Sequence, residues 1–219
     1  QDPHPGAYDG ERQEQHRARG GDAPRRGFLL RVEEEQTRER DLEQAHVALA
    51  FPAFAFGDPD FHALQVYSTL LGGGMSSRLF QEVREARGLA YSVFSFTASY
   101  VDSGLFTIYA GTGEEQLAEL LPVIAEELGK VVAAVGDDEV ARARAQLKAG
   151  LLMSLESSSS RAEQLGRQML IYGRPLDVDE LTGAVDAVDA PAVRRVARRV
   201  LTGGRPALAA LGPISRLEN

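Results

Sequence analysis

The chain has 219 residues, of which 43% are hydrophobic and 26% charged, and its formal net charge is −8. This length suits one well-buried domain or two small ones, and the acidic balance argues against a nucleic-acid partner, which needs basic surface. The chain contains no cysteine, which excludes disulfides, thiolate nucleophiles and cysteine-based zinc sites.

The first part of the chain predicts a linker followed by strands and a helix. Residues 1–27 are polar and rich in Gly, Pro and Arg, which is typical of a linker or weakly ordered arm. The stretches FLLRVEEEQ (28–36) and AHVALAFPAF (45–54) read as strands, the second one buried. GDP follows, and Pro59 suits the first turn of a helix that ends near Leu71.

A second helix and a hairpin are expected next. Ser76 or Ser77 can cap a helix over about 78–87, and Gly88 is a natural stop for it. The sequence then reads AYSVFSFTASY, VDSG and LFTIYAG. Two runs rich in aromatic and β-branched residues around a short polar turn predict a β-hairpin.

The second half of the chain is predicted to be mostly helical. Thr112 and Glu115 form a capping-box pattern ahead of an apolar stripe that reaches Val135, with a kink expected near Pro122. Asp137 and the serine run 157–160 are further candidate caps. The remaining helices are expected at about 137–155, 160–172, 178–186 and 190–201, and PALAALGPI (206–214) closes the chain as a strand.

The order of these elements predicts the fold class. Strands cluster early, a helical block follows, and one strand comes last, which favours an α+β layer: a mainly antiparallel sheet with helices packed on one face. Regular βαβ alternation is missing, so a doubly wound fold is disfavoured. The longest apolar run, at 47–56, contains a proline and is too short to span a bilayer, so we expect no membrane partner.

Three glycines, Gly72 to Gly74, precede the second helix and could present N–H groups to a phosphate. A P-loop needs a following Lys and Ser or Thr, whereas the only lysines are Lys130 and Lys148. A dinucleotide-binding loop should follow a strand, but these glycines follow a helix. The pattern favours a structural turn in which glycine relieves the strain of a positive φ.

The sequence contains no strong pattern of metal-binding residues or of a catalytic nucleophile. The four histidines are His4, His16, His46 and His62, and no two are spaced to share a helix face as zinc ligands. His46 lies in an apolar strand pattern and is expected to be a hydrogen-bonded core residue, whereas His62 suits a helix surface. No serine has a GxSxG context.

Two clusters of charged residues are better explained as solvent-exposed surface than as ligand-binding sites. The arginines at 194, 195, 198 and 199 lie opposite the apolar stripe of the last helix, and Glu33 to Glu35 lie near the end of the first predicted strand. A solvated helix face and a solvated strand edge are the expected structures, with an anion-binding patch as the alternative for the arginines.

Arg84 and Tyr91 remain as candidate site residues. Arg84 lies near the end of the second helix, Tyr91 begins the next strand, and Gly88 folds the chain back between them. The spacing can place both side chains on one rim of the sheet, where two hydrogen-bond donors could grip a peptide carbonyl or stabilise an oxyanion. On spacing alone, a solvated Arg and a packed Tyr are the default.

These residues lie in a segment with a family resemblance. LGGGMSSRLFQEVREARGLAYSVFSF, residues 71–96, resembles the C-terminal half of the pitrilysin-like (insulinase family) zinc metallopeptidases, in the branch of the mitochondrial processing peptidase and its bacterial relatives. DLEQAHVALAFPAF, SYVDSGLFTIYAGT and the later helices extend the resemblance over roughly residues 28–213. It implies that residues 28–219 form one domain, which has the fold of one half of the processing peptidase and binds substrate.

The resemblance implies an activity and a division of roles. In that family, the N-terminal half carries His-x-x-Glu-His, and the C-terminal half supplies an Arg and a Tyr that reach the substrate, which here are Arg84 and Tyr91. Because His-x-x-Glu-His is missing from this chain, zinc would belong to an N-terminal half or a homologous partner subunit. We therefore expect this chain alone to bind no zinc and to be inactive.

The resemblance also implies a peptide substrate, a dimer in the intact enzyme, and a soluble protein of the bacterial cytoplasm or periplasm. A non-catalytic homologue that acts as a scaffold subunit is the alternative, although such homologues tend to lose the Arg and the Tyr. A glycine-loop nucleotide binder is a third hypothesis, disfavoured by the missing lysine and strand.

Overall fold

The computed structural model describes residues 34–215, and the predicted linker at 1–27 lies outside them. The chain forms one five-stranded sheet in the order β1-β5-β2-β4-β3. The strands are β1 (Glu34–Glu39), β2 (Ala45–Ala53), β3 (Ser92–Ser99), β4 (Gly104–Thr112) and β5 (Ala207–Gly212). β1 pairs with β5 in parallel and every other pairing is antiparallel, which confirms the mainly antiparallel sheet.

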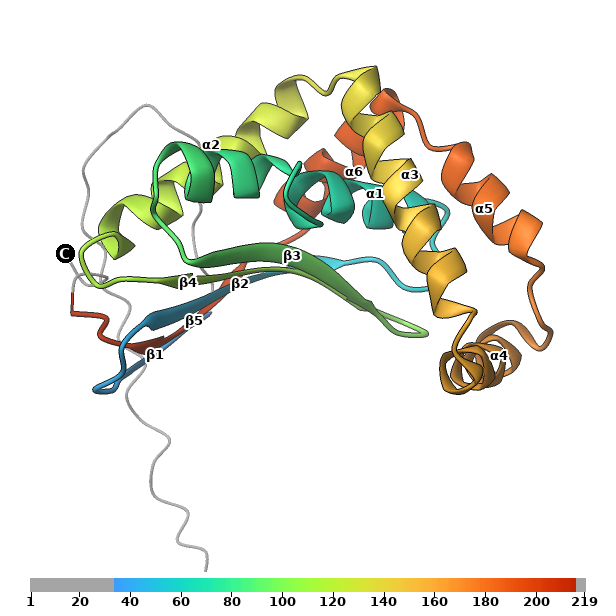
Figure 1. Cartoon of the computed structure of the whole chain (residues 1–219), viewed down its shortest axis with the longest axis horizontal. Helices are drawn as coiled ribbons and strands as arrows, with labels where there is room; N and C mark the ends of the chain where they lie inside the picture. The colour runs from blue at the N-terminus through green and yellow to red at the C-terminus, as the bar shows by residue number, and fades with distance from the viewer. Residues whose placement is uncertain (1–33, 216–219) are drawn as a thin grey trace, which may run out of the picture.

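Seven helices accompany the sheet within the described residues. They are α1 (Phe61–Gly72), the π-helix η1 (Phe80–Ala86), α2 (Leu117–Ala133), α3 (Asp137–Ser154), α4 (Ser158–Tyr172), α5 (Val178–Asp186) and α6 (Ala190–Thr202). Figure 1 shows α1, α2 and α6 on the upper face of the sheet, whereas α4 lies at one end of the molecule. The prediction of an α+β fold with helices packed on one face is confirmed.

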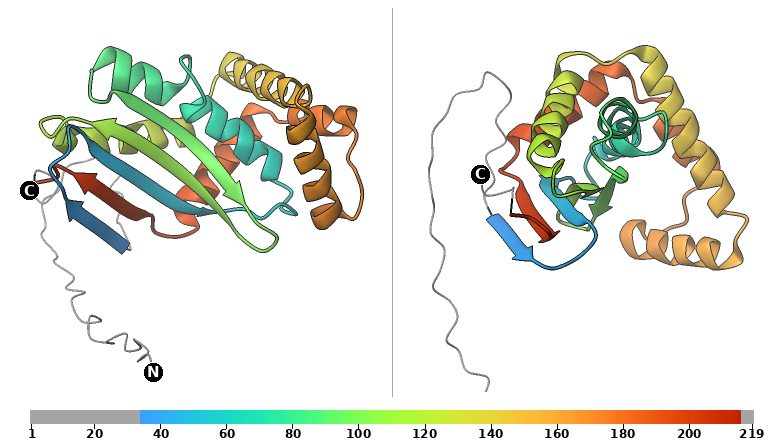
Figure 2. Two further views of the ribbon diagram at one scale, coloured as in Figure 1. Left: turned by 60° about the horizontal axis from the view of Figure 1, so that its bottom comes forward. Right: turned by 60° about the vertical axis from the view of Figure 1, so that its left-hand side comes forward.

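The core lies between the sheet and this helix layer. Alternate residues of β2 point into it, so that Val47, Leu49 and Phe51 are buried, as a strand with one covered face requires. α1 and α6 supply the other side through Leu64, Val196 and their neighbours. No helix of residues 34–215 covers the lower face of the sheet in Figure 1, and the left view of Figure 2 shows its five strands side by side. No helix among the described residues is long and apolar enough to cross a membrane.

Several local predictions are confirmed and others are wrong. The hairpin forms as β3 and β4, and Ser157 caps α4 by accepting the N–H of Ser160. By contrast, Thr112 lies in β4 and its hydroxyl donates to the carbonyl of Leu89, so it caps no helix; α2 begins at Leu117, after Gln116. The capping-box pattern compares only residues 112–115. It could not reveal that Thr112 is bonded to Leu89, more than twenty residues earlier in the chain.

Other boundaries differ from their predictions by small shifts. The first strand was predicted at 28–36; β1 (Glu34–Glu39) runs three residues beyond the predicted end, and residues 28–33 lie outside the described part of the chain. Gly136, not Asp137, is the N-cap of α3. Neither candidate serine caps the second helix, because the Ser77 hydroxyl donates to the carbonyl of Gly74.

The glycine run has a structural role, but the predicted reason for it is wrong. Among the described glycines, only Gly88, Gly173 and Gly212 have positive φ. Gly72 is needed for a different reason, because a methyl group there would lie 2.9 Å from the carbonyl carbon of Phe94 and overlap the backbone nitrogen of Ser95. The glycine therefore allows α1 to approach the backbone of β3 closely.

Replacement of Gly72 by alanine should lower the free energy of unfolding by about 1–3 kcal/mol, because the added methyl group forces α1 away from β3. The matched control is Gly150→Ala in α3, where a methyl group would meet nothing within 4 Å and should stabilise the helix by about 0.5–1 kcal/mol. Urea unfolding measures both variants. Equal effects of the two substitutions would contradict the close approach at Gly72.

Candidate functional site

The predicted site residues lie on either side of one sharp turn. Arg84 is in the last turn of η1, and its side chain is 45% exposed. Gly88 follows with φ 62°, which only glycine adopts freely. Tyr91 directly precedes β3, which is an edge strand of the sheet, and is 62% exposed. Both side chains are therefore accessible, as a binding role requires.

The backbone of this turn is held at several points. The N–H of Leu89 donates to the carbonyl of Val83 at 2.8 Å, and the N–H of Tyr91 donates to the carbonyl of Gly111 at 2.9 Å. Leu89 and Ala90 are buried between these bonds. The segment that separates the two candidate residues is thus anchored to both the helix and the sheet.

The immediate surroundings of Arg84 and Tyr91 are simple. The guanidinium of Arg84 lies 4.8 Å from the centroid of the Phe80 ring, within range of a cation–π contact, and its Nε is 4.0 Å from a carboxylate oxygen of Glu85. The Tyr91 hydroxyl lies beside Gly113, where an added methyl group would be 4.0 Å from it. In the described part of the chain, no hydrogen bond joins Arg84 to Tyr91, so both keep donors for a ligand.

Within residues 34–215, no three His, Cys, Asp or Glu side chains lie close enough together to hold a metal ion. His4 and His16 lie outside the described residues. The described residues therefore do not fit a zinc site by themselves, and what Arg84 and Tyr91 offer to a ligand is hydrogen-bond donors.

The remaining histidines differ from their predictions. His46 is hydrogen-bonded as expected, with Nδ1 2.6 Å from the Tyr109 hydroxyl, but it lies half-buried on the lower sheet face and not in the core. His62 was predicted to be a surface residue, yet its ring is half-buried and its Nδ1 is a buried atom without a hydrogen-bond partner among the described residues. Burial lowers the pKa of His62.

The predicted charged surfaces are only partly solvated. Glu35 is exposed on the edge strand β1, as expected, whereas Glu33 lies outside the described residues. On α6, Arg195 and Arg199 form ion pairs with Asp60 at the start of α1, and Arg199 also binds Asp58. The solvated-face prediction is incomplete for these two arginines: their side chains are 56% and 41% exposed, but carboxylates more than 130 residues away in sequence also bind them.

This ion-pair network joins two helices of the core. Arg195 holds the pKa of Asp60 below its ordinary value, and Arg199 does the same for Asp58. The Arg199 guanidinium also lies 4.0 Å from the centroid of the Phe54 ring. The network fixes the N-terminal end of α1 to α6, and we assign it a structural role.

Comparison with known proteins gives a consistent result. A family model described as the Peptidase M16 inactive domain matches residues 15–147. A protein of Streptomyces coelicolor named as a zinc protease is 44% identical over 176 residues, which cover 80% of this chain and 38% of that protein. The beta subunit of the mitochondrial-processing peptidase of Rattus norvegicus is 39% identical over 193 residues, covering 84% of this chain and 39% of the subunit.

The fold agrees with these sequence matches. A crystal structure of a protease from Helicobacter pylori aligns with a TM-score of 0.72 at 26% identity, covering 82% of this chain and 44% of that one. The sheet, its single helix layer and the matches together define a peptidase-family domain. The chain belongs to the M16 peptidase family, in the part described as the inactive domain. It spans about two fifths of the length of the two curated relatives named above.

Replacement of Arg199 by glutamine should lower the free energy of unfolding by about 1–2 kcal/mol, since it removes charged hydrogen bonds that are partly screened by solvent. Arg198→Gln, an exposed position on the same helix, is the matched control and should change stability by less than about 0.5 kcal/mol. Urea unfolding measures both, and equal losses would contradict the assigned role.

The same network predicts a pH dependence. Because the pKa values of Asp58 and Asp60 are lowered in the folded state, the network stabilises fully above the ordinary carboxyl pKa of about 4. This contribution is lost as pH falls through the lowered values. The stability difference between the unsubstituted protein and Arg199→Gln should therefore shrink below about pH 4. A difference that is constant down to pH 2 would contradict the linkage.

Proposed function

We propose that this chain is the substrate-binding half of a zinc-dependent endopeptidase that cleaves peptides or unfolded polypeptides. Arg84 and Tyr91 bind the carbonyl of the scissile bond, while zinc is held by a separate N-terminal half or by a homologous partner subunit. The observation that carries the proposal is the anchored turn between η1 and β3, which exposes a guanidinium and a phenol on either side of Gly88. Membership of the M16 family supports it.

The roles of the two residues follow from their chemistry. The Tyr91 hydroxyl donates one hydrogen bond, and the Arg84 guanidinium offers several donors in a planar fork. Donors directed at a carbonyl oxygen become more favourable as negative charge develops on it, so they stabilise the transition state more than the bound substrate. Because the backbone on both sides of Tyr91 is fixed, little reorganisation is needed when the substrate binds.

Tyr91→Phe, in this chain assembled with its zinc-bearing half, should lower kcat by about 10²–10³-fold and change KM much less, because it removes one donor to the developing oxyanion. Tyr100→Phe, at an exposed tyrosine in the β3–β4 turn, is the control and should leave kcat unchanged. Steady-state kinetics on a fluorogenic peptide give both constants. An unchanged kcat for Tyr91→Phe would instead support a scaffold subunit without a catalytic role.

The chain alone should bind no zinc at stoichiometric level and should cleave no peptide, because its described residues form no ligand cluster and the sequence contains no His-x-x-Glu-His. Elemental analysis after dialysis against zinc-containing buffer measures the metal content, with the assembled enzyme as the positive control at about one zinc per active site. One zinc per isolated chain would contradict the division of roles.

A further inference from the structure

The lower face of the sheet carries exposed aromatic side chains that the core does not use. Phe94 and Phe96 on β3 are 42% and 45% exposed, and Tyr109 on β4 is half-buried beside them. The ring centroids of Phe94 and Tyr109 are 4.9 Å apart, and those of Phe94 and Phe96 are 6.1 Å apart. These three side chains, here called the aromatic row, form a contiguous exposed apolar surface, which is more informative than scattered exposed residues.

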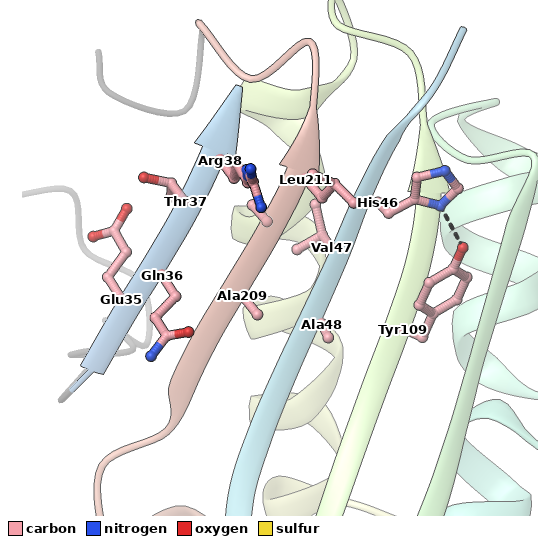
Figure 3. Close-up of a pocket in the computed structure, with 11 residues that line it drawn as sticks. Glu35, Gln36, Thr37, Arg38, His46, Val47, Ala48, Tyr109, Ala209 and Leu211 are labelled. Atoms are coloured by element: carbon pink, nitrogen blue, oxygen red, sulfur yellow. Dashed lines mark hydrogen bonds between the residues drawn. The ribbon is translucent and has the colours of Figure 1, made fainter. Parts of the chain in front are cut away.

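Tyr109 is also one wall of a hollow on this face. The hollow has a volume of about 730 Å³. Ala48, Ala209 and Leu211 line its floor together with His46 and Tyr109, and its far side is polar, formed by β1 residues 35–38. Strand register places Phe94, Tyr109, Ala48 and Ala209 next to one another across four strands. Figure 3 shows the tyrosine and histidine rings beside the alanine positions of β2 and β5. The hollow is within the size range of pockets that bind small ligands or side chains.

The rings that bound this hollow are held in place before any ligand arrives. The Tyr109 hydroxyl shares a 2.6 Å hydrogen bond with His46 Nδ1 (Figure 3), and the two rings are stacked with centroids 6.1 Å apart. Contact with Phe94 fixes the other side of the tyrosine ring. Binding against a preorganised wall costs less conformational entropy than binding against free side chains.

The aromatic row begins three residues after Tyr91 on the same edge of the sheet. Tyr91 donates its backbone N–H to Gly111, which lies opposite both Ser92 and His46 in the sheet. Phe94 is three residues beyond Tyr91 along the chain, about 10 Å in an extended strand. A peptide whose scissile carbonyl lies at Tyr91 would therefore extend a side chain two or three residues away over the aromatic row.

We propose that the aromatic row and its hollow form a specificity subsite that accepts a bulky apolar side chain, aromatic or large aliphatic, of an extended peptide bound at Tyr91. This inference rests on the proposed function. The three side chains of the row are uncharged and present ring faces and edges, so they favour apolar side chains by area burial and ring stacking. Arg84 and Tyr91 bind the peptide backbone and are indifferent to its side chains.

The experiment compares two labelled, unstructured peptides that differ only by Phe or Ala at one position, using fluorescence anisotropy on the 219-residue chain. We expect the Phe peptide to bind about tenfold more tightly. Phe94→Ala should remove this preference and leave the affinity for the Ala peptide unchanged. Leu170→Ala, at an 88% exposed position on α4, is the matched control and should keep the preference. Thermal melting confirms that each variant folds.

Tyr109→Phe and Tyr91→Phe separate the two proposals. Tyr109→Phe keeps the ring and should keep most of the preference, whereas Tyr109→Ala should abolish it. Tyr91→Phe should weaken both peptides equally, because it removes a backbone contact. If Tyr91→Phe has no effect while Phe94→Ala abolishes the preference, the subsite stands and the proposed role of Tyr91 fails.

Two results would overturn the subsite. The first is a folded Phe94→Ala variant that keeps the tenfold preference for the Phe peptide. The second is concentration-dependent dimerisation of the chain in sedimentation equilibrium, lost in Phe94→Ala and accompanied by no peptide preference. That outcome would assign the aromatic row to an interface between two copies of the chain.

Discussion

The candidate site depends on one constrained stretch of backbone, the turn from η1 into β3. The N–H of Leu89 reaches back to Val83, the hydroxyl of Thr112 donates to the carbonyl of Leu89, and the N–H of Tyr91 donates to Gly111. Leu89 and Ala90 are buried, so their side chains anchor the turn to the core. Every donor offered to a ligand is thus attached to backbone that the fold has already fixed, which lowers the cost of binding.

The helix that leads into this turn is itself unusual. η1 is a π-helix over seven residues, whereas π-helices generally occur as single wide turns and often at functional sites. Arg84 lies in its last turn, with the ring of Phe80 beneath the guanidinium. The wider helix changes the direction in which Arg84 projects relative to an α-helix of the same sequence. The geometry of the site therefore depends on backbone hydrogen bonding that side-chain patterns do not encode.

The sequence predicted the elements whose signals are local. The strand β2, the β3–β4 hairpin, the Ser157 cap and the Gly88 stop were all readable within a few residues. β2 was expected to be buried, whereas only one of its faces is. The errors occur where a partner lies far away in sequence. Asp60 pairs with Arg195 across 135 positions, and Gly72 is required by the backbone of Ser95.

The site was predictable only in part, for the same reason. REARGLAY made Arg84 and Tyr91 candidates through its family resemblance, and what the structure adds is the local turn at Gly88 and the strand after it. The aromatic row was missed, although the alternation in SVFSF places Phe94 and Phe96 on one face. Pairing of Phe94 with Tyr109, and of Tyr109 with Ala48, depends on strand register. That register follows from which face each strand buries, and a single sequence does not reveal it.

The two faces of the sheet can serve different purposes because each strand alternates. Val93 and Ser95 face the helix layer, where the Ser95 hydroxyl donates to the carbonyl of Ser68. Phe94 and Phe96 necessarily face the other way, so a strand that closes the core also presents two rings outward. A substitution at an outward position can therefore change the exposed surface with little effect on core packing. In the proposed subsite, this separation lets the side chains that select a peptide change without disturbing the core.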